Sequence, residues 1–257
     1  MTDELLSDRR GPVLTLTLNR PEARNALTPS LVIAIGRAVV GAAADPEIRA
    51  VVLTGTGDRA FCAGMDLRAF AAGGPSDAGT ERAMADFYQL IRGEVGVPLI
   101  GAANATAVAG GFELLLACDV IVASSQAQFG LPEVKRGLFA AGGGTMLGTR
   151  VPLSVALELA LTGDSITAHR AYELGLVNTV VEPAEVLPTA HAFADRVAAN
   201  APLSLAATKE LVRLAVTDPA RAWSRVEHWR PAVFDSEDAK EGAMAFVEKR
   251  APVWRGR

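Results

Sequence analysis

Two glutamates, Glu113 and Glu133, combine a residue type and a spacing that could move protons. Glu113 interrupts the apolar run AVAGGFELLLACDVIVAS directly after a glycine doublet, and a carboxylate is costly to bury unless it is paired, hydrogen-bonded or protonated. Glu133 follows in FGLPEVKRG, beyond an expected strand. If that strand returns the chain to the same end of a sheet, both carboxyl groups face one pocket. Two close carboxyl groups tend to share one proton, which equips them to add or remove water.

The same two residues also have a simpler structural interpretation. An acid in the first turn of a helix is stabilised by the helix dipole, and this would explain Glu113. Glu133 would then be a surface partner of Lys135 or Arg136. The residue types alone favour this structural interpretation, so the catalytic one needs further support.

Two glycine-bearing turns, AFCAGMD and AVAGGFE, could supply backbone amides to the same pocket. Each follows an expected strand and precedes a helical segment, and glycine lets a ligand approach the main chain closely. Amides at a helix start carry the positive end of the helix dipole. Two converging loops of this kind would hold a developing oxyanion, and removing one such donor typically costs about 3–4 kcal/mol of transition-state stabilisation. Glycine turns after strands are common, so the turns alone do not decide the function.

Other common site motifs are absent or incomplete in the sequence. The G-x-G-x-x-A of VVLTGTGDRA lacks the following helix and acid-ending strand of a dinucleotide site, and neither a G-x-S-x-G elbow nor a Walker lysine motif occurs. The histidines are scattered without metal-ligand spacing, so no metal site is expected. Cys62 and Cys118 form no C-x-x-C pair, and we expect two reduced, small apolar thiols in a cytoplasmic protein.

Composition limits the class of protein further. The 257 residues are 50% hydrophobic and 21% charged, which suits one large domain or one domain with an appendage. The net charge of −4 gives no electrostatic footprint for nucleic acid or an anionic membrane. Residues 97–123 are apolar, but they contain proline, asparagine, glycines and two acids, so they indicate buried structure rather than a membrane span. The polar N-terminus MTDELLSDRR has no apolar signal core.

Strands and helices alternate over the first part of the chain, which predicts an α/β architecture. β-branched runs bounded by glycine, proline or asparagine mark the strands. Thr28 followed by Pro29 begins a helix that ends at Asp45-Pro46. The expected strands cover 13–18, 49–55, 98–105 and 119–124, the expected helices cover 28–45, 81–94 and a short segment from 111, and 56–80 is irregular and glycine-rich.

From about Ser154 helical patterns dominate, with one strand-like interruption at 176–181. Thr167 caps a short helix that stops at Gly175. The last 60 or so residues contain no convincing strand and all three tryptophans. Such a helical extension packs either on another subunit or on its own core, and the pattern does not distinguish the two.

The residues of these motifs resemble the crotonase (enoyl-CoA hydratase/isomerase) superfamily over nearly the whole chain, and in particular its enoyl-CoA hydratase branch. The matching segments, in the family's order and spacing, are TLNRPEARNAL, VVLTGTGDRAFCAGMDL, AVAGGFELLLACDVIVAS, AQFGLPEVKRGL, LTGDSITAHRAYELGLVNTVV and EGAMAFVEKRAPVW. The resemblance implies an α/β crotonase fold, with a spiral of repeated ββα units that carries the CoA and acyl site in residues 1–197. A helical C-terminal region, residues 198–257, would mediate trimerisation, which gives a homotrimer or a homohexamer built as a dimer of trimers.

The resemblance also overrides the structural interpretation of the two glutamates. It implies an acyl-CoA substrate whose thioester oxygen is held by the backbone N–H groups of Met65 and Gly110. Glu113 would orient and deprotonate water for attack at the β-carbon of a trans-2-enoyl-CoA, and Glu133 would deliver the proton to the α-carbon. Coenzyme A is part of the substrate, so no separate cofactor is implied. The presence of both glutamates favours hydration over double-bond isomerisation, thioester hydrolysis or a non-catalytic acyl-CoA-binding scaffold.

Six further positions match residues that contact CoA in the family, namely Arg24, Ala63, Asp66, Leu67, Phe246 and Lys249. The last two can reach CoA on a neighbouring subunit, and their alternative is ordinary helix packing and a solvated charge. The sequence departs from the commonest hydratase pattern at GLFAAGGGTMLGTRV, a loop that borders the acyl pocket in the family. A short or medium fatty enoyl-CoA, within fatty acid metabolism, is the default expectation. PEVKRGL also resembles branches that act on carnitine-linked or steroid side-chain thioesters.

Overall fold

A six-stranded sheet forms the centre of the computed structural model, which describes residues 3–68 and 84–257. The strand order is β1-β2-β3-β4-β6-β9. β1 pairs antiparallel with β2, and every other neighbouring pair in this sheet is parallel. The strands are β1 (Leu5–Arg10), β2 (Val13–Leu18), β3 (Ala50–Gly55), β4 (Leu99–Ala103), β6 (Val120–Ser124) and β9 (Thr179–Val181).

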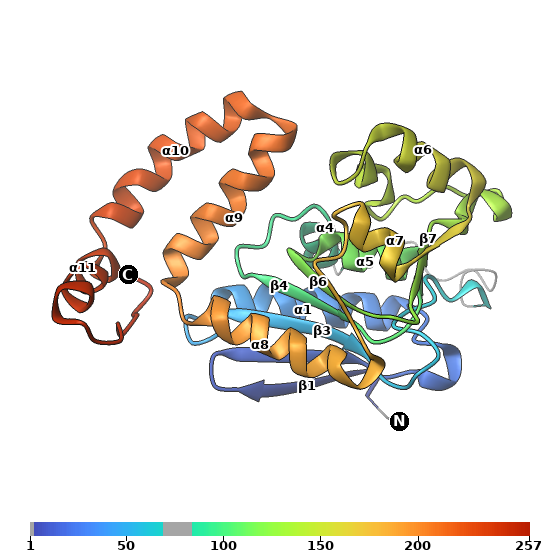
Figure 1. The fold of residues 1–257 in the computed structure, drawn as a ribbon, viewed down its shortest axis with the longest axis horizontal. Helices are drawn as coiled ribbons and strands as arrows, with labels where there is room; N and C mark the ends of the chain where they lie inside the picture. Colours follow the sequence, from blue (N-terminus) through green and yellow to red (C-terminus); the bar gives the residue numbers. More distant parts are fainter. Residues whose placement is uncertain (1–2, 69–83) are drawn as a thin grey trace.

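Helices cover both faces of this sheet, which is why its central strands are continuous apolar runs. Every residue of β3 and β4 is buried. Helix α8 shares one apolar cluster with residues of β3, β4 and β6, and α1, α4 and α5 belong to the larger cluster on the other face (Figure 1). These helices are α1 (Pro29–Ala44), α4 (Ala85–Ile91), α5 (Gly110–Ala117) and α8 (Val186–Ala198).

A second, three-stranded sheet has the order β5-β7-β8, with β5 parallel and β8 antiparallel to β7. β4 leads into β5 and β6 leads into β7, while α5 connects β5 back to β6. This path matches the repeated ββα units that the resemblance implies. The remaining elements of this part are β5 (Ala107–Val108), β7 (Gln128–Gly130), β8 (Ser165–Thr167), α6 (Leu153–Thr162), α7 (Ala168–Glu173) and the 3-10 turns η1 (Pro21–Ala23), η2 (Pro132–Arg136), η3 (Gly144–Thr149) and η4 (Pro183–Glu185).

The capping signals in the sequence are confirmed. The Thr28 side chain accepts a hydrogen bond from the backbone N–H of Leu31, with Pro29 in the first helical position of α1. The Thr167 side chain accepts from the backbone N–H of Arg170 at the start of α7. Because each hydroxyl satisfies an otherwise unpaired N–H, both helices begin where the sequence predicts.

Two expectations about the N-terminal half need correction. No strand is expected before residue 13, yet Leu5–Arg10 forms β1, an edge strand whose side chains are mostly exposed. An exposed edge strand needs no apolar alternation, so the pattern carried no signal. The helix expected at 81–94 covers Ala85–Ile91 in the described part, and residues 81–83 lie outside it, as do residues 69–80 of the irregular stretch.

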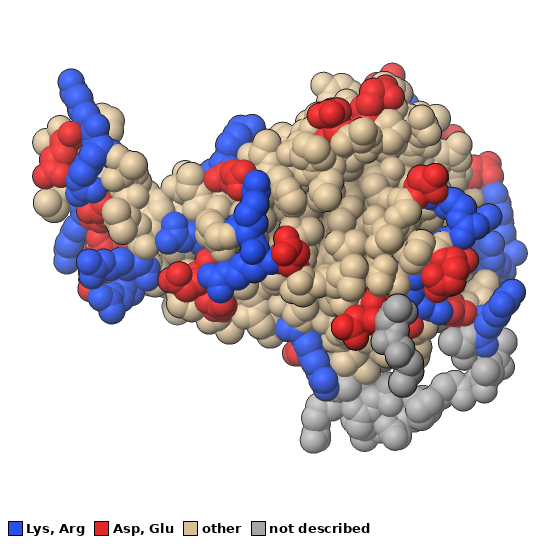
Figure 2. Space-filling model, turned by 90° about the horizontal axis from the view of Figure 1, so that it is seen from below, with Lys and Arg blue, Asp and Glu red and all other residues tan. Residues whose placement is uncertain are grey.

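The C-terminal helices α9 (Pro202–Thr217), α10 (Pro219–Phe234) and α11 (Glu237–Glu248) extend to one side of the sheet (Figure 1). Figure 2 shows the same projection from a second direction, as a lobe joined to the rest of the molecule by a narrower waist. Asp119, directly before β6, forms ion pairs with Lys209 at 2.9 Å and with Arg213 at 2.7 Å. Both cations belong to α9, so these pairs anchor that helix to the sheet. Within the described ranges, no helix is long and apolar enough to cross a membrane.

The segment after α11 folds back toward the waist. The Trp254 indole N–H donates to the carbonyl of Ala199 at 2.7 Å, and the Arg49 guanidinium donates to the carbonyl of Trp254 at 3.0 Å. The buried carboxylate of Asp238 accepts the backbone N–H groups of Arg255 and Gly256. These contacts hold α11 in a defined orientation relative to α8.

Candidate active site

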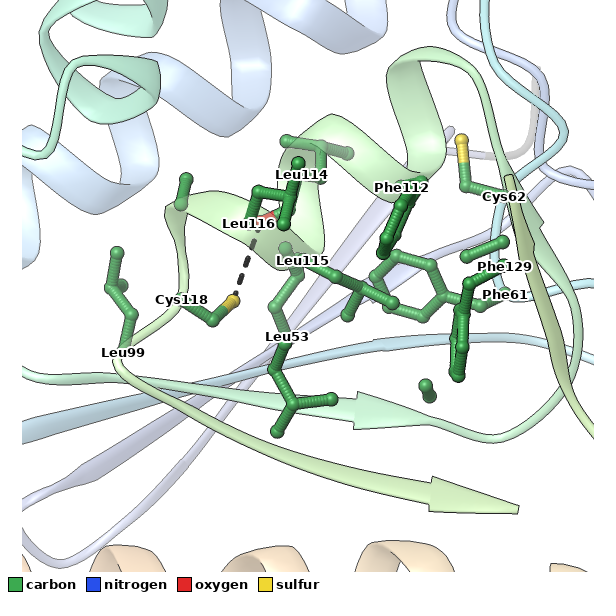
Figure 3. Close-up of a cluster of buried hydrophobic side chains, with 14 of the residues drawn as sticks. Leu53, Phe61, Cys62, Leu99, Phe112, Leu114, Leu115, Leu116, Cys118 and Phe129 are labelled. Atoms are coloured by element: carbon green, nitrogen blue, oxygen red, sulfur yellow. Dashed lines mark hydrogen bonds between the residues drawn. The ribbon is translucent and has the colours of Figure 1, made fainter. Parts of the chain in front are cut away.

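Helix α5 carries Glu113 in its first turn and is apolar on all sides, as expected of a helix buried in a protein core. Phe112 stacks on Phe129 with ring centroids 5.6 Å apart, and Leu114 and Leu115 lie in the same buried cluster (Figure 3). Such close packing leaves the backbone of α5 little freedom to move.

Two arginines hold the C-terminal end of α5. Arg150 donates to the carbonyl of Leu116 at 2.9 Å, and Arg213 donates to the carbonyl of Ala117 at 2.8 Å. Cations at a helix C-terminus satisfy carbonyls that lack intrahelical partners and complement the helix dipole. The helix that positions Glu113 is therefore fixed at the end opposite to the glutamate as well.

The Glu113 side chain is buried and is held by two backbone N–H groups. Its Oε1 atom accepts from Gly142 at 2.8 Å and from Gly144 at 2.9 Å. Burial raises the pKa of Glu113, and the charge of Glu133 raises it further, whereas the two N–H donors oppose the rise. Because Oε1 accepts both hydrogen bonds, Oε2 is the oxygen left to exchange a proton.

The glycines of the loop at 142–144 are required by this arrangement. A Cβ atom at Gly142 would lie 2.5 Å from Glu113 Oε2, and one at Gly144 would lie 2.5 Å from the Cβ of Ala140. Both distances are shorter than real contacts allow. The resemblance implied only that this loop borders the acyl pocket, and its hydrogen bonds to Glu113 were not predicted. The signal that could have found it is the run of three glycines that follows Glu133.

Glu133 lies in the 3-10 turn η2, which begins at Pro132. Its Oε2 atom is buried and has no hydrogen-bond partner among the residues that the structure describes. Burial raises the pKa of Glu133, opposed by its own backbone N–H and by the charge of Arg136. Of the two partners in the structural alternative, Lys135 pairs with Asp164 at 2.5 Å, while Arg136 forms no ion pair with Glu133 in the described part of the chain and acts on it only through its charge. A buried carboxyl oxygen without a partner is suited to a proton, a water molecule or a substrate.

The two glycine turns that could supply amides lie against each other. Val108 donates its backbone N–H to the carbonyl of Cys62 at 3.1 Å, and a Cβ atom at Gly64 would lie 3.1 Å from the backbone nitrogen of Gly110. Within the described part of the chain, neither the Met65 nor the Gly110 backbone N–H donates to a protein acceptor. Two adjacent donors without acceptors are the equipment of an oxyanion site.

Ala109, directly before Gly110, has a φ of 51°, which is uncommon for a residue with a side chain. Its backbone N–H donates to the carbonyl of Gly130 at 3.0 Å, which helps to hold the turn. Backbone strain of this kind is concentrated at functional sites. Nothing in the local sequence marks Ala109 as a residue of positive φ.

Of the six positions matched to CoA contacts, four surround Met65. Arg24 is exposed and its carbonyl accepts the backbone N–H of Ala63 at 3.0 Å, while Asp66 and the exposed Leu67 follow Met65 in the chain. The other two, Phe246 and Lys249, belong to the projecting α11 region and are not brought to this site within one chain (Figure 1). Phe246 is 86% exposed.

Both cysteine thiols are free and buried. Burial raises the pKa of Cys62 to about 12 and that of Cys118 to about 12, so neither is a thiolate near neutral pH. The Cys118 thiol lies under α5 and donates to the carbonyl of Leu114 (Figure 3). Among residues 3–68 and 84–257, no group of three or more His, Cys, Asp or Glu side chains is arranged to hold a metal ion.

Known proteins match this chain along its whole length. The family model for enoyl-CoA hydratase/isomerase matches residues 8–257. A carnitinyl-CoA dehydratase from Salmonella typhi is 39% identical over 268 residues, and the match covers 100% of both chains. Among solved structures, an enoyl-CoA hydratase from Mycobacterium tuberculosis H37Rv has a TM-score of 0.90 at 43% identity, covering 99% of each chain. An enoyl-CoA hydratase from Bacillus anthracis has a TM-score of 0.89 at 30% identity, covering 99% of this chain and 100% of its own.

Proposed function

The chain belongs to the enoyl-CoA hydratase/isomerase family, within the crotonase superfamily, and from this premise we propose that it adds water across the 2,3 double bond of a trans-2-enoyl-CoA thioester to give the 3-hydroxyacyl-CoA. The observation that supports the proposal is that Glu113 is buried and lies within reach of the charge of Glu133. The Oε2 atom of Glu133 is also buried, and burial raises the pKa of both carboxyl groups. Raised pKa values and mutual repulsion favour one proton shared between two such groups.

In the proposed reaction, Glu113 Oε2 takes a proton from water as the water oxygen attacks the β-carbon. Glu133 delivers a proton to the α-carbon, so one proton leaves and one enters the pair in each turnover. Negative charge grows on the thioester oxygen, where the backbone N–H groups of Met65 and Gly110 would receive it. Donors aimed at developing charge stabilise the transition state more than the ground state. Protein groups handle every proton and charge, so the proposal includes no cofactor besides the coenzyme A of the substrate.

The acyl group is the least constrained part of the proposal. A short or medium fatty enoyl-CoA is the default, supported by structural relatives that are named enoyl-CoA hydratases. The second candidate is dehydration of carnitinyl-CoA, supported by the 39% identity to a carnitinyl-CoA dehydratase over the whole chain. Dehydration of a 3-hydroxyacyl thioester is the same chemistry in reverse, so both candidates use the two glutamates in the same way.

Absorbance of the conjugated enoyl thioester tests the reaction. Hydration of crotonyl-CoA and longer enoyl-CoAs removes this band, and dehydration of carnitinyl-CoA creates it. Loss of the thioester band with release of a free thiol would instead identify a thioester hydrolase, and migration of the double bond without uptake of water would identify an isomerase. Ligand binding without any turnover would identify a non-catalytic acyl-CoA-binding protein.

We also propose assembly into a homotrimer or a dimer of trimers through the C-terminal helices. Large apolar side chains lie exposed along α10 and α11, which is unusual for a surface that stays in water. The most exposed are Trp223 at 74%, Phe234 at 75%, Phe246 at 86% and Val247 at 78%. Native light scattering tests this assembly, and a mass of a single chain would contradict it.

A further inference from the structure

The peptide between Gly64 and Met65 is aimed by its contacts with Leu27. The carbonyl of Gly64 accepts the backbone N–H of Leu27 at 2.8 Å, and the backbone N–H of Asp66 donates to the carbonyl of Leu27 at 3.0 Å. The carbonyl and the N–H of one trans peptide point in opposite directions. Pinning the Gly64 carbonyl on Leu27 therefore turns the Met65 N–H away from Leu27. The direction of the Met65 N–H therefore depends on how firmly the segment of Leu27 and the segment of Met65 are held together.

The Arg20 guanidinium holds both of these segments. Its Nη1 donates to the carbonyl of Ala26, the residue before Leu27, at 2.6 Å. Its Nη1 and Nη2 both lie 3.2 Å from Oδ2 of Asp66, the residue after Met65. The side chains of Arg20 and Asp66 are only 17% and 18% exposed, so solvent screens the pair less than an ordinary surface pair. The planar guanidinium of Arg20 thus contacts both segments of the isolated parallel β-bridge between Leu27 and Met65.

The backbone N–H and the Nε of Arg20 are also held by neighbouring residues. The backbone N–H of Arg20 donates to Oδ1 of the fully buried Asn25 at 2.9 Å, and its Nε pairs with Oε1 of Glu4 at 3.0 Å. The other Glu4 oxygen accepts the hydroxyls of Thr28 and Ser30, each at 2.7 Å. An arginine held at its backbone N–H and at Nε can impose a position on the partners of its two terminal nitrogens.

From these contacts we propose that Arg20 is a positioning residue for the backbone N–H of Met65. Arg20 acts through Ala26 and Asp66, and it sets the direction in which the Met65 N–H meets the thioester oxygen. The inference rests on the proposed function, because it assigns Met65 to the acyl-CoA carbonyl. The Asp66 side chain then has a second role besides the CoA contact expected from the resemblance. Its ion pair with Arg20 fixes the position of the loop that contains Met65.

The test compares full-length wild type with Arg20→Met and Arg20→Lys. The probe is 4-dimethylaminocinnamoyl-CoA, whose absorbance band moves to longer wavelength when hydrogen bonds polarise its carbonyl. We expect Arg20→Met to lose most of this shift while still binding the probe. With crotonyl-CoA, kcat should fall about 10- to 100-fold with KM within about threefold, because a misaimed donor weakens the transition state more than the ground state. Arg20→Lys should recover part of the band shift and part of kcat, because lysine keeps the positive charge. Recovery should be incomplete, because one ammonium cannot bind the Ala26 carbonyl and the Asp66 carboxylate in the way that a guanidinium does.

Two further variants keep the result decisive. Arg10→Met removes an ion pair with Asp195 at 2.7 Å on the outside of β1, and it should leave the probe band and kcat unchanged. Asp66→Asn keeps an oxygen for the backbone N–H of Arg68 but loses the charge that Arg20 grips. If circular dichroism shows that Arg20→Met does not fold, Asp66→Asn and Arg20→Lys decide in its place.

The outcomes separate this inference from the function on which it rests. Arg20 variants that bind the probe with the wild-type shift and keep the wild-type kcat would overturn the positioning role, even if their melting temperature falls. A wild-type protein that neither hydrates enoyl thioesters nor shifts the probe band would instead refute the proposed function itself.

Discussion

The backbone N–H of Gly142 lies 2.8 Å from Oε1 of Glu113 and donates a hydrogen bond to it. This contact joins the loop that follows Glu133 to the helix that carries Glu113. A change in the loop should therefore move Glu113 relative to Glu133, so we expect the loop to affect turnover as well as the shape of the proposed acyl pocket.

Gly142→Ala should damage turnover more than stability. The new Cβ would lie 2.5 Å from Glu113 Oε2, so the carboxyl group must shift. We expect kcat to fall at least about tenfold, while overpacking costs about 1–3 kcal/mol of folding free energy. Gly148→Ala is the matched control, since its Cβ would meet nothing closer than 3.6 Å and should leave kcat unchanged. Equal kcat values in the two variants would refute the steric argument.

Glu113→Gln should stabilise the protein in a pH-dependent way. The pKa of Glu113 is raised from its ordinary value of 4.5, so the folded state binds the proton more tightly than the unfolded state. The protonated Glu113 therefore contributes favourably to the free energy of folding. This contribution is complete below pH 4.5 and is lost as the pH rises through the folded-state pKa. Thermal melts should show glutamine raising the melting temperature at pH 8 by more than at pH 5. A gain that does not depend on pH would contradict this account.

Asp119→Asn should loosen the C-terminal helices from the sheet. The substitution leaves the Lys209 ammonium, whose side chain is 6% exposed, without its carboxylate, and breaking a buried pair in this way typically costs about 3–5 kcal/mol. Chemical denaturation measures the loss, and limited proteolysis should show new cleavage near residues 199–202. Lys135→Met removes an exposed pair with Asp164 and serves as the control, with little change expected. Equal losses in the two variants would argue against a buried anchor at Asp119.

The two thiols should resist modification in the folded protein. Both are buried, and burial raises each pKa to about 12, so the reactive thiolate is scarce at pH 8. Ellman's reagent should react with no thiol in the native protein and with both after denaturation. Rapid reaction of either cysteine in the native state would show that α5 and the turn before Met65 open more readily than their packing indicates.

Local signals in the sequence located much of the candidate site. The glycine doublet predicted that a helix begins near residue 110 with Glu113 in its first turn, and the structure confirms that helix. Thr28 and Thr167 likewise predicted the starts of two helices. In each case the signal lies within a few residues of the feature, where side-chain chemistry acts directly on the backbone.

Several contacts between distant segments were not predicted. Arg20 meets Asp66, and Gly142 meets Glu113, only because the fold brings separate loops together. β1 was missed because an exposed edge strand carries no apolar pattern. The division at residues 197 and 198 and the roles of Phe246 and Lys249 stay predictions, since they depend on how chains assemble.

The central claim is that Glu113 and Glu133 act as one acid and base pair. Its most direct test is kcat for hydration of crotonyl-CoA by Glu113→Gln, Glu133→Gln and the double variant, with binding of a CoA ligand measured in each. We predict a loss of at least about a thousandfold in each single variant, a double variant little worse than either, and retained ligand binding, because groups that work as a unit lose their function together. Wild-type turnover in either single variant, or losses that multiply in the double variant, would contradict the claim.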